Sequence, residues 1–161
     1  MAKTNLSSKL YFSYGQFMVY DQIVAAPGCL WTDGHTAQGF ARRASTVCFG
    51  TLLEFGYAEI KYELGPFVAE NLYERVIAVP FVSVSGNCLV EGPEENDVRG
   101  PLEIPSGNYQ LVAAQRVTGE EEEAVDLFFE AVEQLPQHSA IIVADAQIGA
   151  AGALIESADV A

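Results

Sequence analysis

The sequence predicts a mainly β protein: an antiparallel β-sandwich with one short inserted helix. Three observations support this fold class. Phe and Tyr occur mostly among Val and Ile, a combination that suits sheets better than helices. Several short runs are typical of strands, and turn residues join them at close spacing. The chain has 161 residues, half of them apolar, which fits a single domain (residues 1–161) able to bury a core.

The first predicted strand is Leu10–Asp21 (LYFSYGQFMVYD), which carries aromatic residues on both of its faces. Residues 1–8 before it are expected to form a loose N-terminus. Residues 25–28 (AAPG) end the strand, because Pro and Gly interrupt the pattern there. The chain is therefore expected to change direction before residue 30.

A short helix is expected after this break. Thr32 or Asp33 can cap its N-terminus, since their side-chain oxygens accept hydrogen bonds from the first backbone N–H groups of a helix. Gly34 and Gly39 weaken the helix and limit its length. Four apolar residues recur at helical spacing after the cap: Ala37, Phe40, Ala41 and Ala44.

A series of strands follows the helix. Alternation is clearest in Tyr57–Leu64, where one face is polar and the other apolar. Residues 85–87 (SGN) are typical of a hairpin, because Gly and Asn adopt positive φ readily. Residues 92–100 are expected to form a polar loop, and residues 105–108 (PSGN) a turn. The predicted strands are Thr46–Leu53, Tyr57–Leu64, Tyr73–Val84, Cys88–Glu91, Tyr109–Val117 and Ile141–Val143.

Residues 118–132 fit two structures. Thr118 and Glu121 could form a capping box for a helix with one apolar stripe. Asp126–Val132 (DLFFEAV) could instead complete a sheet as a strand, with Glu120–Glu123 as the loop before it. The pattern alone does not decide between them. An alanine-rich tail, residues 149–161, ends the sequence.

Acidic residues are concentrated in the second half of the chain. The net charge is −14, from 8 basic and 22 acidic residues. Residues 1–90 carry six basic and seven acidic side chains, a net of −1, whereas residues 91–161 carry two basic and fifteen acidic, a net of −13. Such a surface repels nucleic acids and anionic membranes and attracts a basic partner. Solubility alone is the simpler interpretation of the composition.

The only basic doublet, Arg42-Arg43, is too small for a nucleic-acid site in a chain of this net charge. We expect both arginines on the solvent side of the predicted helix, paired with nearby acids. The expected location is the cytoplasm. The start of the chain lacks a signal-peptide pattern, and the apolar runs are too short to span a bilayer.

Neither a catalytic centre nor a metal site is predicted. Cys29, Cys48 and Cys88 are odd in number and widely separated, so they indicate buried reduced thiols and not a disulfide framework or zinc ligands. His35 has no second His nearby and is expected at the surface. The sequence contains no G-x-S-x-G, H-E-x-x-H or glycine-rich phosphate loop. We therefore predict no enzyme activity, no metal and no cofactor.

Trp31 and the acidic runs have two interpretations each. Trp31 could pack in the core and hold the helix against a sheet, or it could be an aromatic anchor at an interface. The carboxylates in Glu94-Glu95 and Glu120–Glu123 are expected in solvent, where nothing shifts their pKa values far enough for acid–base catalysis.

Four motifs in a fixed order resemble the competence protein J family, inhibitors of the DNA-entry nuclease in competent bacteria. The motifs are Ser13–Val19 (SYGQFMV), WTD at 31–33 followed after five residues by GFA at 39–41, Tyr73–Phe81 (YERVIAVPF) and Ile104–Leu111 (IPSGNYQL). The resemblance runs from about Leu10 to Val117, with a weaker continuation to Val132, and leaves a C-terminal extension at about 133–161. It also favours a strand at Asp126–Val132.

The resemblance implies a non-enzymatic protein that binds a nuclease and blocks it. A carboxylate-rich surface suits this role, because it can compete with phosphates for the basic groove of a nuclease. The rival is a β-sandwich that binds a small ligand or forms a homo-oligomer without inhibition, and an apolar pocket lined by Tyr and Phe with Trp31 at its mouth would favour it. The predicted contact residues are Trp31, Asp33, Glu91, Glu94, Glu95, Asp97, Glu120, Glu121, Glu122 and Glu123.

Overall fold

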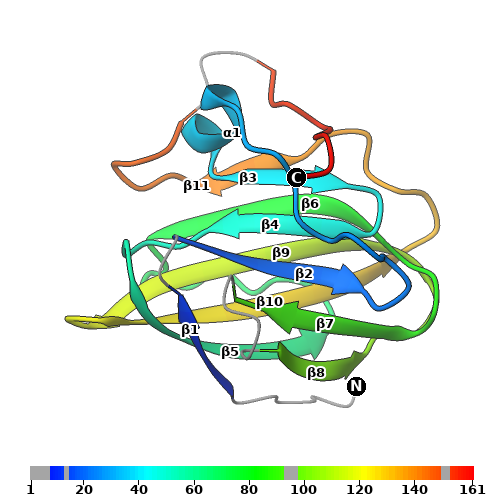
Figure 1. The fold of residues 1–161 in the computed structure, drawn as a ribbon, viewed down its shortest axis with the longest axis horizontal. Coiled ribbons are helices and arrows are strands. Elements are labelled where there is room, and N and C mark those ends of the chain that lie inside the picture. Colours follow the sequence, from blue (N-terminus) through cyan, green and yellow to red (C-terminus); the bar gives the residue numbers. More distant parts are fainter. Residues whose placement is uncertain (1–7, 13–14, 93–97, 150–152) are drawn as a thin grey trace.

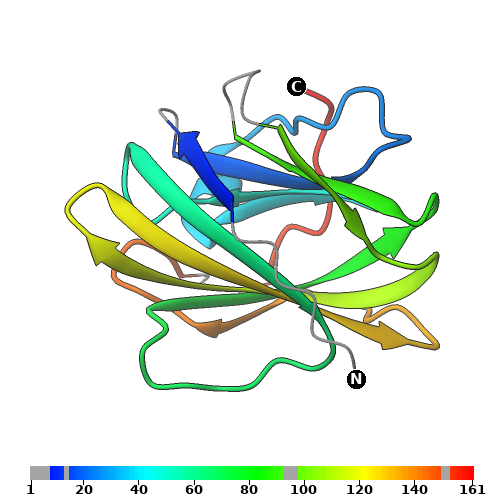
Figure 2. The ribbon, with the colours of Figure 1, turned by 90° about the horizontal axis from the view of Figure 1, so that it is seen from below.

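The computed structural model describes residues 8–12, 15–92, 98–149 and 153–161, which form two stacked β-sheets (Figures 1 and 2). In spatial order, sheet A contains β1 (Ser8–Phe12), β5 (Gly56–Leu64), β10 (Glu122–Val132), β9 (Gly107–Gly119), β6 (Arg75–Ser83) and β11 (Ala140–Val143). Sheet B contains β3 (Phe40–Arg43), β4 (Thr46–Gly50), β2 (Gln16–Asp21), β7 (Asn87–Glu91) and β8 (Val98–Glu103).

The predicted mainly β fold with one short helix is confirmed in the described part of the chain. Its strand pairs are antiparallel with one exception. Strand β10 runs parallel to β5, with Val125 opposite Ile60, and antiparallel to β9 on its other side. Sequential β9 and β10 form a hairpin that is inserted between β5 and β6 in sheet A.

Two strand predictions were wrong in detail. Leu10–Asp21 is two strands in different sheets, β1 in sheet A and β2 in sheet B, so its aromatic residues do not belong to one two-faced strand. The loop expected at residues 92–100 overlaps β8, which pairs with β7 at the edge of sheet B.

Residues 122–132 form a strand, as the family resemblance favoured. Val125, Leu127 and Phe129 point into the core between the sheets, while Phe128 packs on the outer face of sheet A. Both faces of this strand are partly covered, so its sequence shows no clean alternation and fits a helix equally well.

The core lies between the two sheets and is rich in aromatic side chains. Phe129 is at its centre, with edge-on ring contacts to Tyr62, Phe81 and Tyr109 at centroid distances of 6.4, 5.9 and 6.1 Å. A smaller cluster on the outer face of sheet A includes Tyr73 and Phe128. Most of the buried aromatic area therefore holds the two sheets together.

The helix α1 (Asp33–Gln38) is shorter than its apolar spacing predicted. Thr32 caps it, and His35 completes a capping box by accepting the Thr32 N–H at Nδ1 (2.9 Å). Gly39 ends it with φ +87°, a left-handed conformation that glycine adopts without strain. Phe40 and Ala41 belong to the next strand, β3, and not to the helix.

His35 is buried, which contradicts the expected surface position. Its Nδ1 accepts a backbone N–H, so the ring proton is on Nε2, which donates to the Ser157 carbonyl at 2.9 Å. His35 thus links the start of α1 to the C-terminal tail.

Residues after β10 return to both sheets (Figure 1). Strand β11 pairs with the edge of sheet A at β6. Residues 153–161 then run past α1 and β3 and pair with residues 28–30, through Leu30 N to Asp159 O (2.7 Å). Gln38 holds this tail by exchanging two hydrogen bonds with the Ile155 backbone, at 2.8 and 3.0 Å.

Both arginines of the doublet lie in strand β3, and not on a helix. Arg42 does pair with an acid as expected, forming an ion pair with Glu156 at 3.2 Å. Arg43 instead donates to the carbonyls of Ala26 and Gly28, at 2.5 and 2.9 Å. The basic doublet therefore stabilises the loop and the tail beside β3.

Candidate functional site

The β9–β10 hairpin carries most of the acidic run predicted from the sequence. Glu120 and Glu121 lie at its tip and are exposed, and Glu122 is half-buried at the start of β10. The hairpin extends from one end of the sandwich (Figure 1). We call this end, with residues 51–55 beside it, the hairpin end.

Glu123, the last residue of the run, is fully buried, so the expectation that the whole run is solvated was wrong. Its carboxylate accepts hydrogen bonds from the backbone N–H groups of Leu52 (3.0 Å) and Leu53 (2.9 Å). Burial raises the pKa of Glu123 above its usual value, although these hydrogen bonds and nearby Arg75 oppose the shift. Glu123 is a structural carboxylate and is not part of an exposed contact surface.

The buried Glu123 carboxylate determines where the loop between β4 and β5 lies. By accepting hydrogen bonds from Leu52 and Leu53, it anchors to the hairpin the loop in which Glu54 is exposed. Tyr57 N donates to Glu121 O at 2.8 Å, and a Cβ at Gly56 would be 2.3 Å from that oxygen. Sequence reasoning missed Glu54, because a single acid in a short loop gives no signal of its own.

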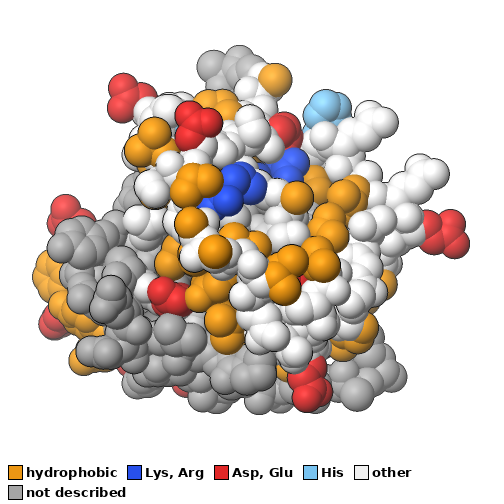
Figure 3. All heavy atoms as spheres, turned by 45° about the vertical axis from the view of Figure 1, so that its right-hand side comes forward, with side chains coloured by type: hydrophobic (Ala, Val, Ile, Leu, Met, Phe, Trp, Pro, Cys, Tyr) orange, Lys and Arg blue, Asp and Glu red, His pale blue; other side chains and the backbone are white. Residues whose placement is uncertain are grey.

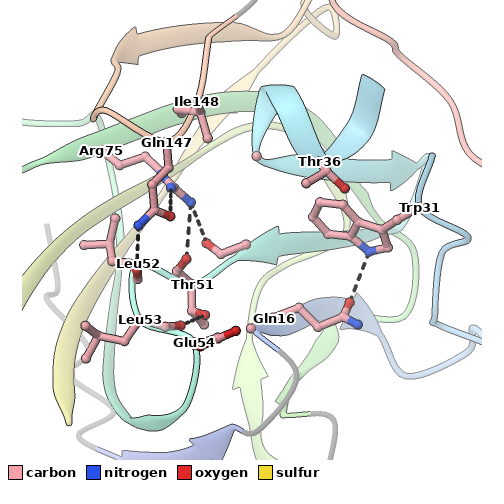
Figure 4. A pocket seen from close by; sticks show the side chains of 13 residues that line it. Gln16, Trp31, Thr36, Thr51, Leu52, Leu53, Glu54, Arg75, Gln147 and Ile148 are labelled. Carbon is pink, nitrogen blue, oxygen red and sulfur yellow. Dashed lines mark hydrogen bonds between the residues drawn. The ribbon is translucent and has the colours of Figure 1, made fainter. Parts of the chain in front are cut away.

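An open pocket of about 700 Å³ lies next to this acidic group (Figure 4). Trp31 and Gln16 form one side of it, and the indole N–H donates to the Gln16 side chain at 3.2 Å. Leu52, Leu53 and Gln147 line the other side. Trp31 is half-buried and also packs against a small cluster on sheet B, so both of its predicted roles remain compatible with its position.

Arg75 forms the polar base of this pocket and is only 2% exposed. Its guanidinium makes an ion pair with Asp145 (3.0 Å) and donates to Gly50 O (3.1 Å) and to Gln147 Oε1 (3.3 Å). These bonds occupy the guanidinium, so Arg75 supports the pocket wall and does not offer a free cation to a ligand.

Residues 9–135 match the family described as Competence protein J (ComJ). The chain belongs to the ComJ family.

A curated relative of this chain is the DNA-entry nuclease inhibitor of Bacillus subtilis (strain 168). It is 28% identical over 111 residues, which cover 69% of this chain and 82% of that protein. The fold agrees as well. The crystal structure of ComJ from Bacillus subtilis, described as an inhibitor of the DNA-degrading activity of NucA, has a TM-score of 0.71 at 23% identity, over 82% of this chain and 99% of that chain.

A second solved structure with this fold is the Crocagin biosynthetic gene J protein. It has a TM-score of 0.55 at 14% identity and covers 80% of this chain and 98% of that chain. The ComJ match ends at residue 135, before β11. Asp145, Glu156 and the other tail residues that contact the sandwich are therefore outside the matched region, and we call residues 136–161 the C-terminal segment.

Asp33 and Glu91 lie in elements other than the β9–β10 hairpin and the 51–55 loop. Asp33 is exposed in the first turn of α1. Glu91 is half-buried in β7 opposite Met18 and accepts a hydrogen bond from the Tyr20 hydroxyl at 2.6 Å. Burial, and then this bond, raise the pKa of Tyr20. Glu94, Glu95 and Asp97 lie outside the described residues.

The face shown in Figure 3 differs from the hairpin end. Its basic side chains lie among hydrophobic and acidic ones, and its acidic side chains are scattered over the face. Among the described residues, no cluster of His, Cys, Asp and Glu could hold a metal ion, and no helix is long and apolar enough to cross a membrane.

Proposed function

We propose that this ComJ-family protein binds a DNA-entry type nuclease and blocks it without catalysing a reaction. Family membership supports this proposal, because the curated relative is named a DNA-entry nuclease inhibitor. The observation that carries the mode of binding is the group of exposed carboxylates at the hairpin end: Glu54, Glu120 and Glu121, with Glu122 beside them.

The proposed mechanism is competition for the DNA site of the nuclease. A nuclease holds DNA through basic groups that contact successive phosphates. Several carboxylates on one rigid hairpin present a similar series of negative charges, and they also increase the rate of encounter with a basic surface. Glu123 contributes indirectly, since its hydrogen bonds to Leu52 and Leu53 hold the loop of Glu54 beside the hairpin.

Trp31 is the proposed apolar anchor beside this charged surface. Its half-exposed ring borders the pocket that Glu54 also lines. Tryptophan residues next to a polar rim contribute strongly to protein interfaces. Replacing Trp31 with Ala should weaken inhibition by about tenfold, whereas Leu30→Ala, at an exposed apolar neighbour, should leave inhibition unchanged.

The main experiment measures cleavage of linear double-stranded DNA by a purified DNA-entry type nuclease while this protein is titrated in. We expect cleavage to stop near equal concentrations at low salt and inhibition to weaken at high salt, because exposed charges are screened. Full nuclease activity with an excess of this protein at low salt would reject the proposal for that nuclease.

A pair of charge-matched variants tests the contact surface. The triple variant Glu54→Gln, Glu120→Gln, Glu121→Gln should lose about tenfold in inhibition, from three rim charges of a few tenths of a kcal/mol each. The control changes three exposed acids elsewhere, Glu70→Gln, Glu103→Gln and Glu133→Gln, with the same change in net charge. Equal loss in both triples would mean that net charge, and not the hairpin end, determines binding.

The rival function was a β-sandwich that binds a small ligand or forms a homo-oligomer, and its ligand-binding form receives no support from the pocket beside Trp31. A pocket lined by Tyr and Phe would have favoured that function. The lining here includes Glu54, Arg75 and Gln147, and the described lining contains no Tyr or Phe. A pocket of this chemistry fits a polar side chain of a protein partner better than an apolar small molecule.

A further inference from the structure

Two buried cysteines that are far apart in the sequence meet on the outer face of sheet B. Cys48 lies in the middle of β4, between Met18 of β2 and Ala41 of β3. Cys29 lies in the connection before α1 and pairs through its backbone with Val160 of the C-terminal segment. The two side chains share one apolar cluster, and the Cys48 thiol donates to the Pro27 carbonyl at 3.9 Å, two residues before Cys29.

Arg43 supplies a positive charge next to this thiol pair. Its Nη2 donates to Gly28 O, on the residue immediately before Cys29. Its Nε is buried and has no hydrogen-bond partner among the described protein atoms. A thiolate at Cys29 would be stabilised by this nearby cation.

The two sulfurs differ in their chemistry. The Cys48 side chain lowers the pKa of Cys29, and Arg43 lowers it further, although burial opposes both. The Cys29 side chain and burial raise the pKa of Cys48, which stays a thiol. Cys88 has neither partner, and burial raises its pKa to about 12. One nucleophilic thiolate with an adjacent thiol is the arrangement found in thiols that are oxidised selectively.

We propose that Cys29 and Cys48 are an oxidation site that reacts with hydrogen peroxide to form a reversible disulfide across the outer face of sheet B. This inference rests on the cysteine geometry and is independent of the proposed nuclease inhibition.

The reaction has two steps. The Cys29 thiolate attacks one peroxide oxygen, the O–O bond breaks, and Cys29 becomes a sulfenic acid while hydroxide leaves and takes up the proton that Cys29 released. The Cys48 sulfur then attacks the Cys29 sulfur, the S–O bond breaks, and water leaves with the Cys48 proton. In total, two thiols and one hydrogen peroxide give one disulfide and two waters.

The disulfide would attach residues 28–30 covalently to β4. Those residues also carry the backbone pairing with the C-terminal segment, through Leu30 N to Asp159 O and Ala161 N to Gly28 O. Trp31 follows two residues after Cys29. Oxidation would therefore restrict the connection that positions Trp31 and the tail.

The test treats the folded full-length chain with hydrogen peroxide and counts free thiols after unfolding. We expect the wild type to lose two of its three thiols within one chain, with the mass falling by two hydrogen atoms. Peptide mapping should find Cys29 linked to Cys48, and dithiothreitol should restore both thiols. Cys88→Ser should behave like the wild type, since Cys88 takes no part.

Single replacements separate the two roles. In Cys48→Ser, the Cys29 sulfenic acid should persist and be trapped by dimedone, whereas Cys29→Ser should give neither sulfenic acid nor disulfide. Arg43→Gln should slow disulfide formation at least tenfold, and Arg42→Gln should not. Retention of all three wild-type thiols, while the unfolded chain is oxidised under the same conditions, would overturn the proposal. Crosslinks between chains or through Cys88 would overturn it as well.

Discussion

The hairpin end and the C-terminal segment are both acidic, but the first exposes carboxylates to solvent, whereas carboxylates of the second form ion pairs with the sandwich. At the hairpin end, Glu54, Glu120 and Glu121 face solvent. In the C-terminal segment, Asp145 and Glu156 point inward and pair with Arg75 and Arg42 of the sandwich. The acidic residues of these two regions therefore fall into two groups. The exposed ones are available for binding, and the paired ones stabilise the fold.

The largest effect should come from removing the carboxylate that pairs with buried Arg75. Asp145→Ala leaves a guanidinium that is 2% exposed without its counter-ion, and such a change costs about 3–5 kcal/mol in the free energy of unfolding. Guanidinium chloride unfolding measures this loss. The control is Asp159→Ala, an exposed acid of the same segment, which should change stability by less than about 0.5 kcal/mol. Similar values for the two variants would contradict the structural role of Asp145.

The next effect concerns Glu123, the inward-pointing member of the hairpin run. Glu123→Ala leaves the N–H groups of Leu52 and Leu53 without their acceptor and should cost about 2–3 kcal/mol. Glu121→Ala, two residues earlier and exposed, should be nearly neutral in urea unfolding. Equal free energies of unfolding for the two variants would show that Glu123 contributes no more to stability than its exposed neighbour Glu121.

A smaller effect depends on pH and involves Glu156. Burial alone would raise its pKa, but hydrogen bonds from Ser139 and the Arg42 ion pair lower it below the usual value. A lowered pKa stabilises the fold above the unfolded-state pKa of about 4.3, and this contribution is lost as the pH falls through the folded-state pKa. Glu156→Gln should cost about 1 kcal/mol at neutral pH.

The same variant should lose less stability than the wild type between about pH 5 and pH 3. Thermal unfolding across this range, with Glu121→Gln as the exposed control, tests the sign. An identical pH dependence of stability for wild type and Glu156→Gln would show that Glu156 does not form its bonds to Ser139 and Arg42 in solution.

The smallest change in stability should accompany the largest change in binding. The triple variant Glu54→Gln, Glu120→Gln, Glu121→Gln should unfold within about 0.5 kcal/mol of the wild type, because these side chains are exposed. The nuclease assay and an unfolding curve on one preparation measure both properties. A strong loss of stability would mean that the hairpin carboxylates also hold the fold.

Local patterns in the sequence were sufficient for most of the fold. Alternation of polar and apolar residues identified β5. A capping residue, Thr32, and a glycine, Gly39, were enough to place a short helix between them. The prediction failed where tertiary packing replaced local pattern. Phe40 and Ala41 have helical spacing but belong to strand β3. His35 is buried, and Ser157, 122 residues later, accepts its Nε2–H.

The sequence predicted an acidic region for the candidate site, but it did not predict which of its carboxylates are exposed. The charge asymmetry pointed to residues 120–123, yet no pattern in four consecutive glutamates distinguishes Glu123 from its neighbours. That distinction arises because a strand directs alternate side chains to opposite faces, and it requires the position of Leu52 and Leu53. Glu54 and the Arg75–Asp145 pair depend on contacts across the fold and could not be read from local sequence.

The long separation between Arg75 and Asp145 has a consequence for the order of folding. Synthesis makes Arg75 70 residues before Asp145, and His35 122 residues before Ser157. During synthesis, the two sheets can therefore assemble only with these polar groups still hydrated and one edge of the sandwich open. Contacts of such long sequence separation slow folding, so we expect a late kinetic phase in which the C-terminal segment docks and water leaves Arg75.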